Sequence, residues 1–77
     1  MFIEVIKAEY IDGYKLNIKF NNGKKGVIDL EHDLWGDVFE SLKDKEKFKQ
    51  FKIKFDTITW KNGADFAPEY LYSKLGD

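Results

Sequence analysis

The sequence predicts an α+β fold, in which an antiparallel sheet carries two or three short helices on one face. Alternating apolar segments near the N-terminus are separated by the turn dipeptides Asp12-Gly13 and Asn22-Gly23. The middle of the chain has apolar residues at helical spacing, and Pro68 suits the first turn of a later helix. A length of 77 residues leaves room for one hydrophobic core, so residues 1–77 are expected to form a single domain.

Three antiparallel strands are expected first. Residues Ile3 to Tyr10 alternate loosely, as in a strand with one irregularity. Tyr14 to Phe20 is the clearest strand, because every second residue is apolar and the residues between are lysine or asparagine. Asn22-Gly23 can hold positive φ at both central positions of a tight hairpin turn, so a third strand is expected around Lys24 to Leu30. Together these strands predict a meander.

Two short helices are expected next. Residues 37–42 have apolar side chains at spacings of one and three, which fit a short helical turn. Asp44 is a plausible N-cap for the second helix, with Phe48 and Phe51 three residues apart on its apolar side.

The last third of the chain predicts two more strands of the same sheet and a terminal helix. Residues 53–57 alternate as one strand, and Ile58 to Trp60 follows as the other. Asn62-Gly63 is expected to close a turn. The helix is expected to begin near Pro68, with Asp65 or Ala67 as its cap.

Composition narrows the function classes. All 13 basic residues are lysine, and the absence of arginine argues against base-specific DNA reading and phosphoryl transfer. The absence of cysteine removes disulfides, thiolate zinc sites and cysteine nucleophiles, and it fits a reducing cytoplasm. The uncharged runs are too short for a membrane span, and the N-terminus does not read as a signal peptide. A cytoplasmic location without membrane contact is therefore expected.

The segment from Thr59 to Tyr72 is the most distinctive part of the chain. Trp60 suits a core anchor, Asn62-Gly63 a turn, Asp65 an Asx-turn or cap, and Pro68 a helix start. These roles explain most of the motif without a ligand. The nearby aromatic residues Phe66, Tyr70 and Tyr72 exceed what a short terminal helix needs for docking, and they are a candidate surface for a protein partner or a second copy.

The order of these strings resembles a bacterial family, domain of unknown function 2442. The resemblance spans nearly the whole chain, from the strand and turn of residues 14–23 through the Phe39-x-x-Leu42 pair to Trp60-x-Asn62-Gly63-x-Asp65-x-x-Pro68-Glu69-x-Leu71-Tyr72. It implies a small cytoplasmic α+β protein without an assigned activity. Members are often encoded beside another short protein, which implies an antitoxin-like half of a two-gene pair and a partner encoded by the neighbouring gene.

Charged segments offer two further hypotheses. Residues 29–40 place carboxylates at EF-hand spacing, but Leu34 stands where that loop needs glycine, so a solvated acidic loop is the preferred interpretation and no metal is assigned. Residues 43–54 hold six lysines, among them Lys45, Lys47 and Lys49 as a candidate polyanion surface. This segment is either a solvated helix face, a partner-selecting surface, or a site of weak, salt-dependent nucleic-acid binding.

No constellation supplies the groups of an enzyme. His32 is the single histidine, and the hydroxyls Ser41 and Ser73 lie in no nucleophile-elbow context. No cofactor-binding motif occurs. The sequence therefore predicts a non-enzymatic protein-interaction module, with weak, sequence-non-specific nucleic-acid binding through residues 43–54 as the alternative.

Overall fold

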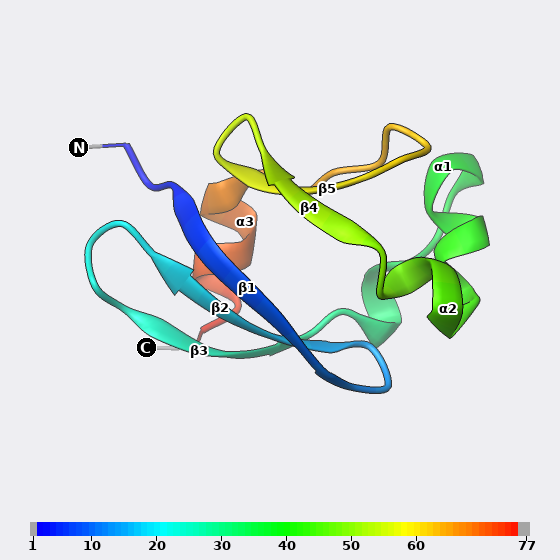
Figure 1. Cartoon of the computed structure of the whole chain (residues 1–77), viewed down its shortest axis with the longest axis horizontal. Coiled ribbons are helices and arrows are strands. Elements are labelled where there is room, and N and C mark those ends of the chain that lie inside the picture. Colours follow the sequence, from blue (N-terminus) through cyan, green and yellow to red (C-terminus); the bar gives the residue numbers. More distant parts are fainter. Residues whose placement is uncertain (1, 76–77) are drawn as a thin grey trace.

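The computed structural model describes residues 2–75, and its strands and helices confirm the α+β prediction (Figure 1). The elements follow one another as β1 (Val5–Asp12), β2 (Lys15–Phe20), β3 (Lys25–Asp29), η1 (Glu31–Asp33), α1 (Asp37–Glu40), η2 (Ser41–Lys43), α2 (Lys45–Phe48), β4 (Phe51–Lys54), β5 (Thr57–Trp60) and α3 (Pro68–Ser73). Within the described residues, no helix has the length and apolar character needed to cross a membrane.

Strands β1, β2 and β3 form the predicted antiparallel meander, in that order. Leu16, Ile18 and Phe20 of β2 are fully buried, whereas Lys15 and Lys19, which alternate with them, are exposed. The alternation read from the sequence is therefore the alternation between the core face and the solvent face of the sheet. Strand β1 is less regular, with register shifts after Val5 and after Tyr10.

The turn between β2 and β3 differs from the expected one. In this turn Gly23 has a positive φ (+90°), and Asn22 does not. Gly23 N donates to Phe20 O (3.0 Å), and Phe20 N donates to Lys24 O (2.8 Å). This is a three-residue loop that ends in a left-handed glycine, and Asn22 serves it through its side chain, whose Oδ1 accepts from Lys24 N (3.0 Å).

Strands β4 and β5 form their own two-stranded sheet, so the prediction of one continuous sheet is wrong. The chain turns at Phe55 and Asp56, which the sequence pattern had assigned to a strand. Both residues have positive φ, 54° and 68°, as a two-residue hairpin turn of the primed type requires. Asp56 O accepts a hydrogen bond from Val5 N (2.9 Å), which links this hairpin to β1.

The helices are short, and their starts follow local signals. Asp44 caps α2 as predicted, because its Oδ1 accepts from Glu46 N (3.0 Å). Phe51 lies in β4 rather than on that helix. Helix α3 begins at Pro68 with Ala67 as its N-cap; Asp65 is not the cap, and its backbone instead forms an isolated antiparallel bridge with Thr59.

One hydrophobic cluster joins these elements over the inner face of the three-stranded sheet. The ring of Tyr72 from α3 packs edge-on against Phe20 at one end of β2, with centroids 5.1 Å apart. Phe48 of α2 packs edge-on against Tyr10 and Tyr14 at the other end. The β4–β5 hairpin contributes Ile58 and Trp60 to the same cluster. The outer face of the sheet faces solvent.

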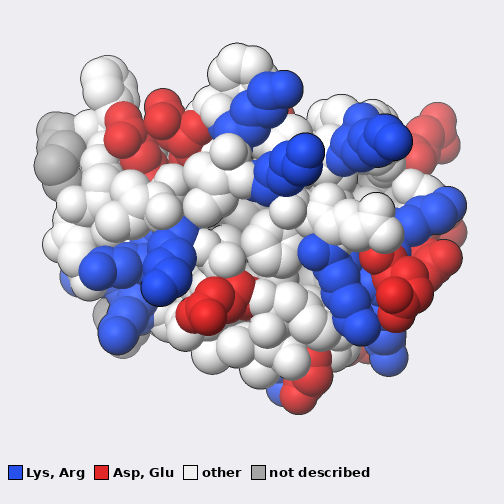
Figure 2. Space-filling view, in the orientation of Figure 1, with Lys and Arg blue, Asp and Glu red and all other residues white. Residues whose placement is uncertain are grey.

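The 13 lysines and 14 carboxylate residues of the chain nearly balance, which leaves a net charge of −1. Figure 2 shows lysine and carboxylate side chains interspersed with uncharged ones on the face that it presents. A group of lysines lies at the left of that view, over one end of the three-stranded sheet.

Candidate functional site

The motif around Trp60 begins with a tight turn that leaves β5. Gly63 has a φ of +92°, which only glycine adopts without strain, and its N–H donates to Trp60 O (2.9 Å). Trp60 N donates to Ala64 O (2.9 Å), and Asn62 Oδ1 accepts from Ala64 N (3.0 Å). The backbone bonds and the asparagine contact repeat those of the turn between β2 and β3, so Asn22 and Asn62 have the same local role.

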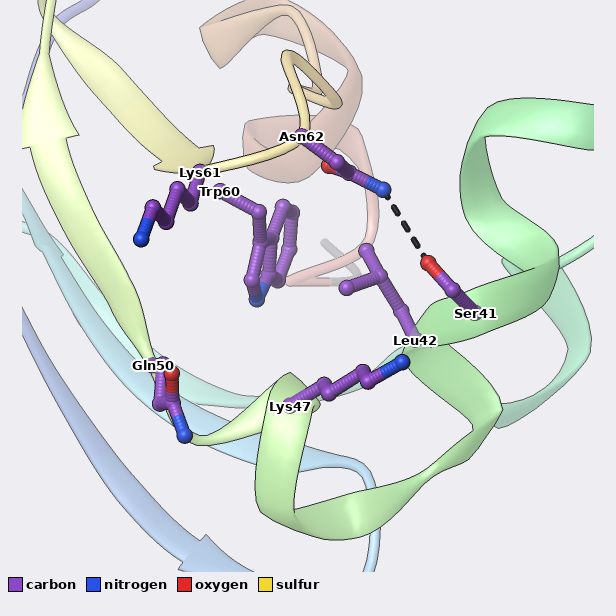
Figure 3. A pocket seen from close by; sticks show the side chains of 7 residues that line it. All are labelled: Ser41, Leu42, Lys47, Gln50, Trp60, Lys61 and Asn62. Carbon is purple, nitrogen blue, oxygen red and sulfur yellow. Dashed lines mark hydrogen bonds between the residues drawn. The ribbon is translucent and has the colours of Figure 1, made fainter.

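Asn62 also reaches across to the helical segment. Its Nδ2 donates to Val38 O (2.8 Å) and to Ser41 Oγ (3.1 Å), the second of which is drawn in Figure 3. Val38 belongs to α1 and Ser41 to η2. A residue expected only to shape a turn therefore also ties that turn to two helices.

Trp60 is a core anchor, as the sequence suggested. It is 3% exposed, and its indole N–H donates to Phe48 O (2.8 Å). Its ring packs against the rings of Phe48 and Phe66 at centroid distances of 5.7 and 5.9 Å. The indole thus buries a large apolar area while its one polar atom is satisfied.

A hollow of about 290 Å³ lies between the turn and the helices. Figure 3 shows the lining side chains, which come from η2, from α2 and its end, and from the start of the turn: Ser41, Leu42, Lys47, Gln50, Trp60, Lys61 and Asn62. Two ammonium groups and two amides line it, and no carboxylate does. Among the described residues that line the hollow, no histidine or carboxylate stands beside the Ser41 hydroxyl as a general base would.

The aromatic residues predicted as a partner surface do not share one surface. Phe66 is 8% exposed and belongs to the core, where it stacks between Phe39 (4.8 Å) and Tyr70 (5.9 Å). Tyr70 and Tyr72 are two residues apart on α3 and point to different sides of that helix. Tyr70 is 43% exposed and is the member that remains available to a partner.

Tyr70 and Lys74 of α3 both contact Asp33 of η1. The Tyr70 hydroxyl donates to Asp33 Oδ1, and Lys74 Nζ lies 3.0 Å from Asp33 Oδ2. The hydrogen bond to Asp33 raises the pKa of Tyr70, because losing the proton would place a phenolate beside a carboxylate. The contact with Asp33 likewise raises the pKa of Lys74.

Tyr72 is held on the opposite side by the first asparagine turn. Asn22 Nδ2 donates to the Tyr72 hydroxyl (3.0 Å), and Lys24 Nζ lies over the ring, 5.6 Å from its centroid. The donor from Asn22 lowers the pKa of Tyr72, because it stabilises the phenolate. Tyr72 therefore fastens the terminal helix to the meander.

A comparison with known protein families assigns this sequence to a family. The model of a protein family of unknown function, DUF2442, matches residues 5–76, which include all of the motif just described. The chain belongs to the DUF2442 family. Neither the curated proteins nor the solved structures give a match to this sequence.

The lysines singled out in this DUF2442 chain do not form one surface. Lys45 and Lys49 lie over the rings of Tyr14 and Tyr10, at 5.7 and 5.2 Å from the centroids. Lys49 also pairs with Glu46 (3.3 Å). Lys47 lines the hollow of Figure 3 instead.

Three carboxylates of the acidic segment 29–40 have protein partners. Asp29 Oδ1 accepts from Glu31 N (2.9 Å), Asp33 contacts Tyr70 and Lys74, and Glu40 lies 3.3 Å from Lys43 Nζ. Within residues 2–75, no three His, Cys, Asp or Glu side chains are grouped as a metal site would require. His32 lies exposed in η1, and Ser73 Oγ donates to Tyr70 O (2.6 Å).

Sequence reasoning missed Trp35, a large apolar residue that the fold leaves exposed. It is 73% exposed and precedes Gly36, whose φ of +93° turns the chain into α1. Val38, on α1, is 47% exposed. The sequence did contain a signal for this exposure. Trp35 lies in an irregular segment without apolar periodicity, whereas a tryptophan of the core belongs to a periodic apolar pattern.

Proposed function

We propose that this DUF2442 domain is a non-enzymatic protein-interaction module that binds its partner through the Trp35 surface, which consists of Trp35, Val38, Phe39 and Tyr70. The proposal is supported above all by the exposure of Trp35. Leaving 73% of an indole in water forfeits the burial that stabilises small domains, and tryptophan is enriched among the residues that dominate binding energy.

The members of this surface come from two parts of the chain that the fold holds together. Phe39 stacks on Phe66, which stacks on Tyr70, so α1 and α3 share a continuous aromatic stack. Trp35 follows two residues after Asp33, whose carboxylate accepts from the Tyr70 hydroxyl. The aromatic edge of the surface therefore rests on packed elements, which lowers the entropy cost of binding.

The resemblance to families encoded in pairs makes the product of the adjacent gene the first partner to test, as in an antitoxin-like pair in the bacterial cytoplasm. The domain would be expressed alone and together with its neighbour, and complex formation would be followed by co-purification and calorimetry. We expect a complex with Trp35 intact and at least about a 30-fold weaker one for Trp35→Ala, the loss typical of an interface hot spot.

Phe55→Ala is the matched control. Phe55 is also an exposed aromatic, at 82%, but it lies on the β4–β5 turn rather than near α1. Both variants should keep the melting temperature within a few degrees, because neither side chain belongs to the core. Equal affinity of Trp35→Ala and the parent chain, or equal losses in the two variants, would contradict the proposed surface.

A further inference from the structure

The outer face of the three-stranded sheet carries three lysines in one cross-strand row. The register pairs Lys7 of β1 with Lys19 of β2, and Lys19 with Lys25 of β3. Residues directly opposite each other point to the same face, so the three side chains stand side by side. All three are exposed, on the face opposite the buried Ile18 and Phe20.

This arrangement is unfavourable unless something compensates the charge. Like charges directly opposite each other in an antiparallel pair are destabilising, and here two such pairs share Lys19. The ion pairs formed among residues 2–75 use the other lysines Lys43, Lys49 and Lys74. The lysine row therefore has no carboxylate within ion-pair distance in the described part of the chain.

The lysine row borders a small hollow of about 150 Å³, which Glu9 and Asn17 of the next row complete. The group of lysines at the left of Figure 2 lies over this end of the sheet. Neighbouring strands are about 4.8 Å apart, so the row extends over about 10 Å. A linear anion with several charges fits that span better than a single spherical one.

The chemistry of the lining selects among polyanions. No aromatic side chain lines the hollow, so nothing there can stack on a nucleic-acid base. Lysine lacks the planar fork by which arginine binds carboxylates and phosphates, and it binds phosphate as a point charge, so several phosphates in a line suit a row of lysines. We propose that Lys7, Lys19 and Lys25 bind a linear oligophosphate, either free or as the phosphate chain of a nucleotide.

The full chain would be titrated with sodium tripolyphosphate, ATP and orthophosphate at about 20 mM salt, where screening is weak. We expect tripolyphosphate to bind at least about tenfold more tightly than orthophosphate and to shift the amide signals of the lysine row. ATP binding as tightly as tripolyphosphate would show that the phosphate chain alone is recognised, and tighter ATP binding would identify the nucleotide as the source. Equal affinity for orthophosphate and tripolyphosphate, or tighter binding of duplex DNA than of either oligophosphate, would overturn the proposal.

Lys19→Gln separates binding from folding, because it removes the charge shared by both pairs and keeps a polar side chain that is only one atom shorter. The free variant should melt at a higher temperature than the parent chain and should lose at least about tenfold in tripolyphosphate affinity. The control is Lys52→Gln, since Lys52 also lies on a strand but faces Thr59. Unchanged affinity in Lys19→Gln, a lower melting temperature of that free variant, or an equal loss in Lys52→Gln would each refute the site.

Discussion

Asn62→Ala tests whether the family motif is a structural tie. The substitution removes three hydrogen bonds, which join Asn62 to Ala64 N within the turn and to Val38 O and Ser41 Oγ in the helical segment. The Gly63 conformation and the buried Trp60 ring are left in place. The change therefore addresses the contacts of the amide group and not the hydrophobic core.

The expected cost follows from those three bonds. A net contribution of about 0.5–1.5 kcal/mol per bond, taken near its lower end because the side chain is exposed, gives a loss of about 2 kcal/mol in the free energy of unfolding. For a domain of this size that corresponds to a fall of roughly 8–16 °C in melting temperature. Ser41→Ala should cost much less, because the bond to Val38 O remains.

Asn22→Ala is the matched comparison, because Asn22 has the same position in the turn between β2 and β3. It makes two side-chain hydrogen bonds, to Lys24 N and to the Tyr72 hydroxyl, so a loss of about 1 kcal/mol is expected. Urea unfolding of both variants would measure the difference. If Asn62→Ala costs no more than Asn22→Ala, the two contacts to Val38 and Ser41 stabilise the fold no more than the single contact of Asn22 to Tyr72, and the reasoning fails.

Two further predictions concern the hairpin turn and alkaline pH. Replacing Phe55-Asp56 by Asn-Gly should raise the free energy of unfolding by about 1 kcal/mol or more, because both positions have positive φ; chemical denaturation that shows no gain would contradict the strain. Asp33 raises the pKa values of Tyr70 and Lys74 in the folded protein. The stability that these contacts contribute is therefore fully present below about pH 10, and it is lost as the pH rises through the pKa values of the folded protein. The stability difference between the parent chain and Asp33→Asn should therefore shrink above about pH 10, and a constant difference in alkaline melting curves would refute it.

Local signals predicted the elements whose boundaries are set within a few residues. The alternation of Tyr14 to Phe20 marks a strand with one buried face, Asp44 caps α2, and Pro68 begins α3. In each case the signal and the structure it determines lie within one turn or one strand. Sequence reasoning is strong there because no distant contact has to be known.

Distant contacts decided the places where prediction failed. Phe55-Asp56 continues an alternating pattern and contains neither glycine nor asparagine, yet the chain reverses there. Asp56 O accepts from Val5 N, which is 51 positions earlier. Asn62 is a plain turn residue by its sequence context, and its bond to Val38 O appears only once α1 is in place. The sequence also could not show which of the aromatic residues near Pro68 are buried. The fold buries Phe66 and leaves Tyr70 exposed.

The β4–β5 hairpin has an edge at which copies of the protein could associate in a concentrated solution. Strand β4 pairs with β5 along one edge, and within residues 2–75 no ladder forms on its other edge. The segment from Phe51 to Phe55 alternates bulky apolar residues with Lys52 and Lys54, and Ile53 is 41% exposed. Exposed apolar strand edges tend in general to pair with other copies, and lysines at such an edge disfavour that pairing because like charges repel. Acetylation of both lysines would remove that protection without touching the core.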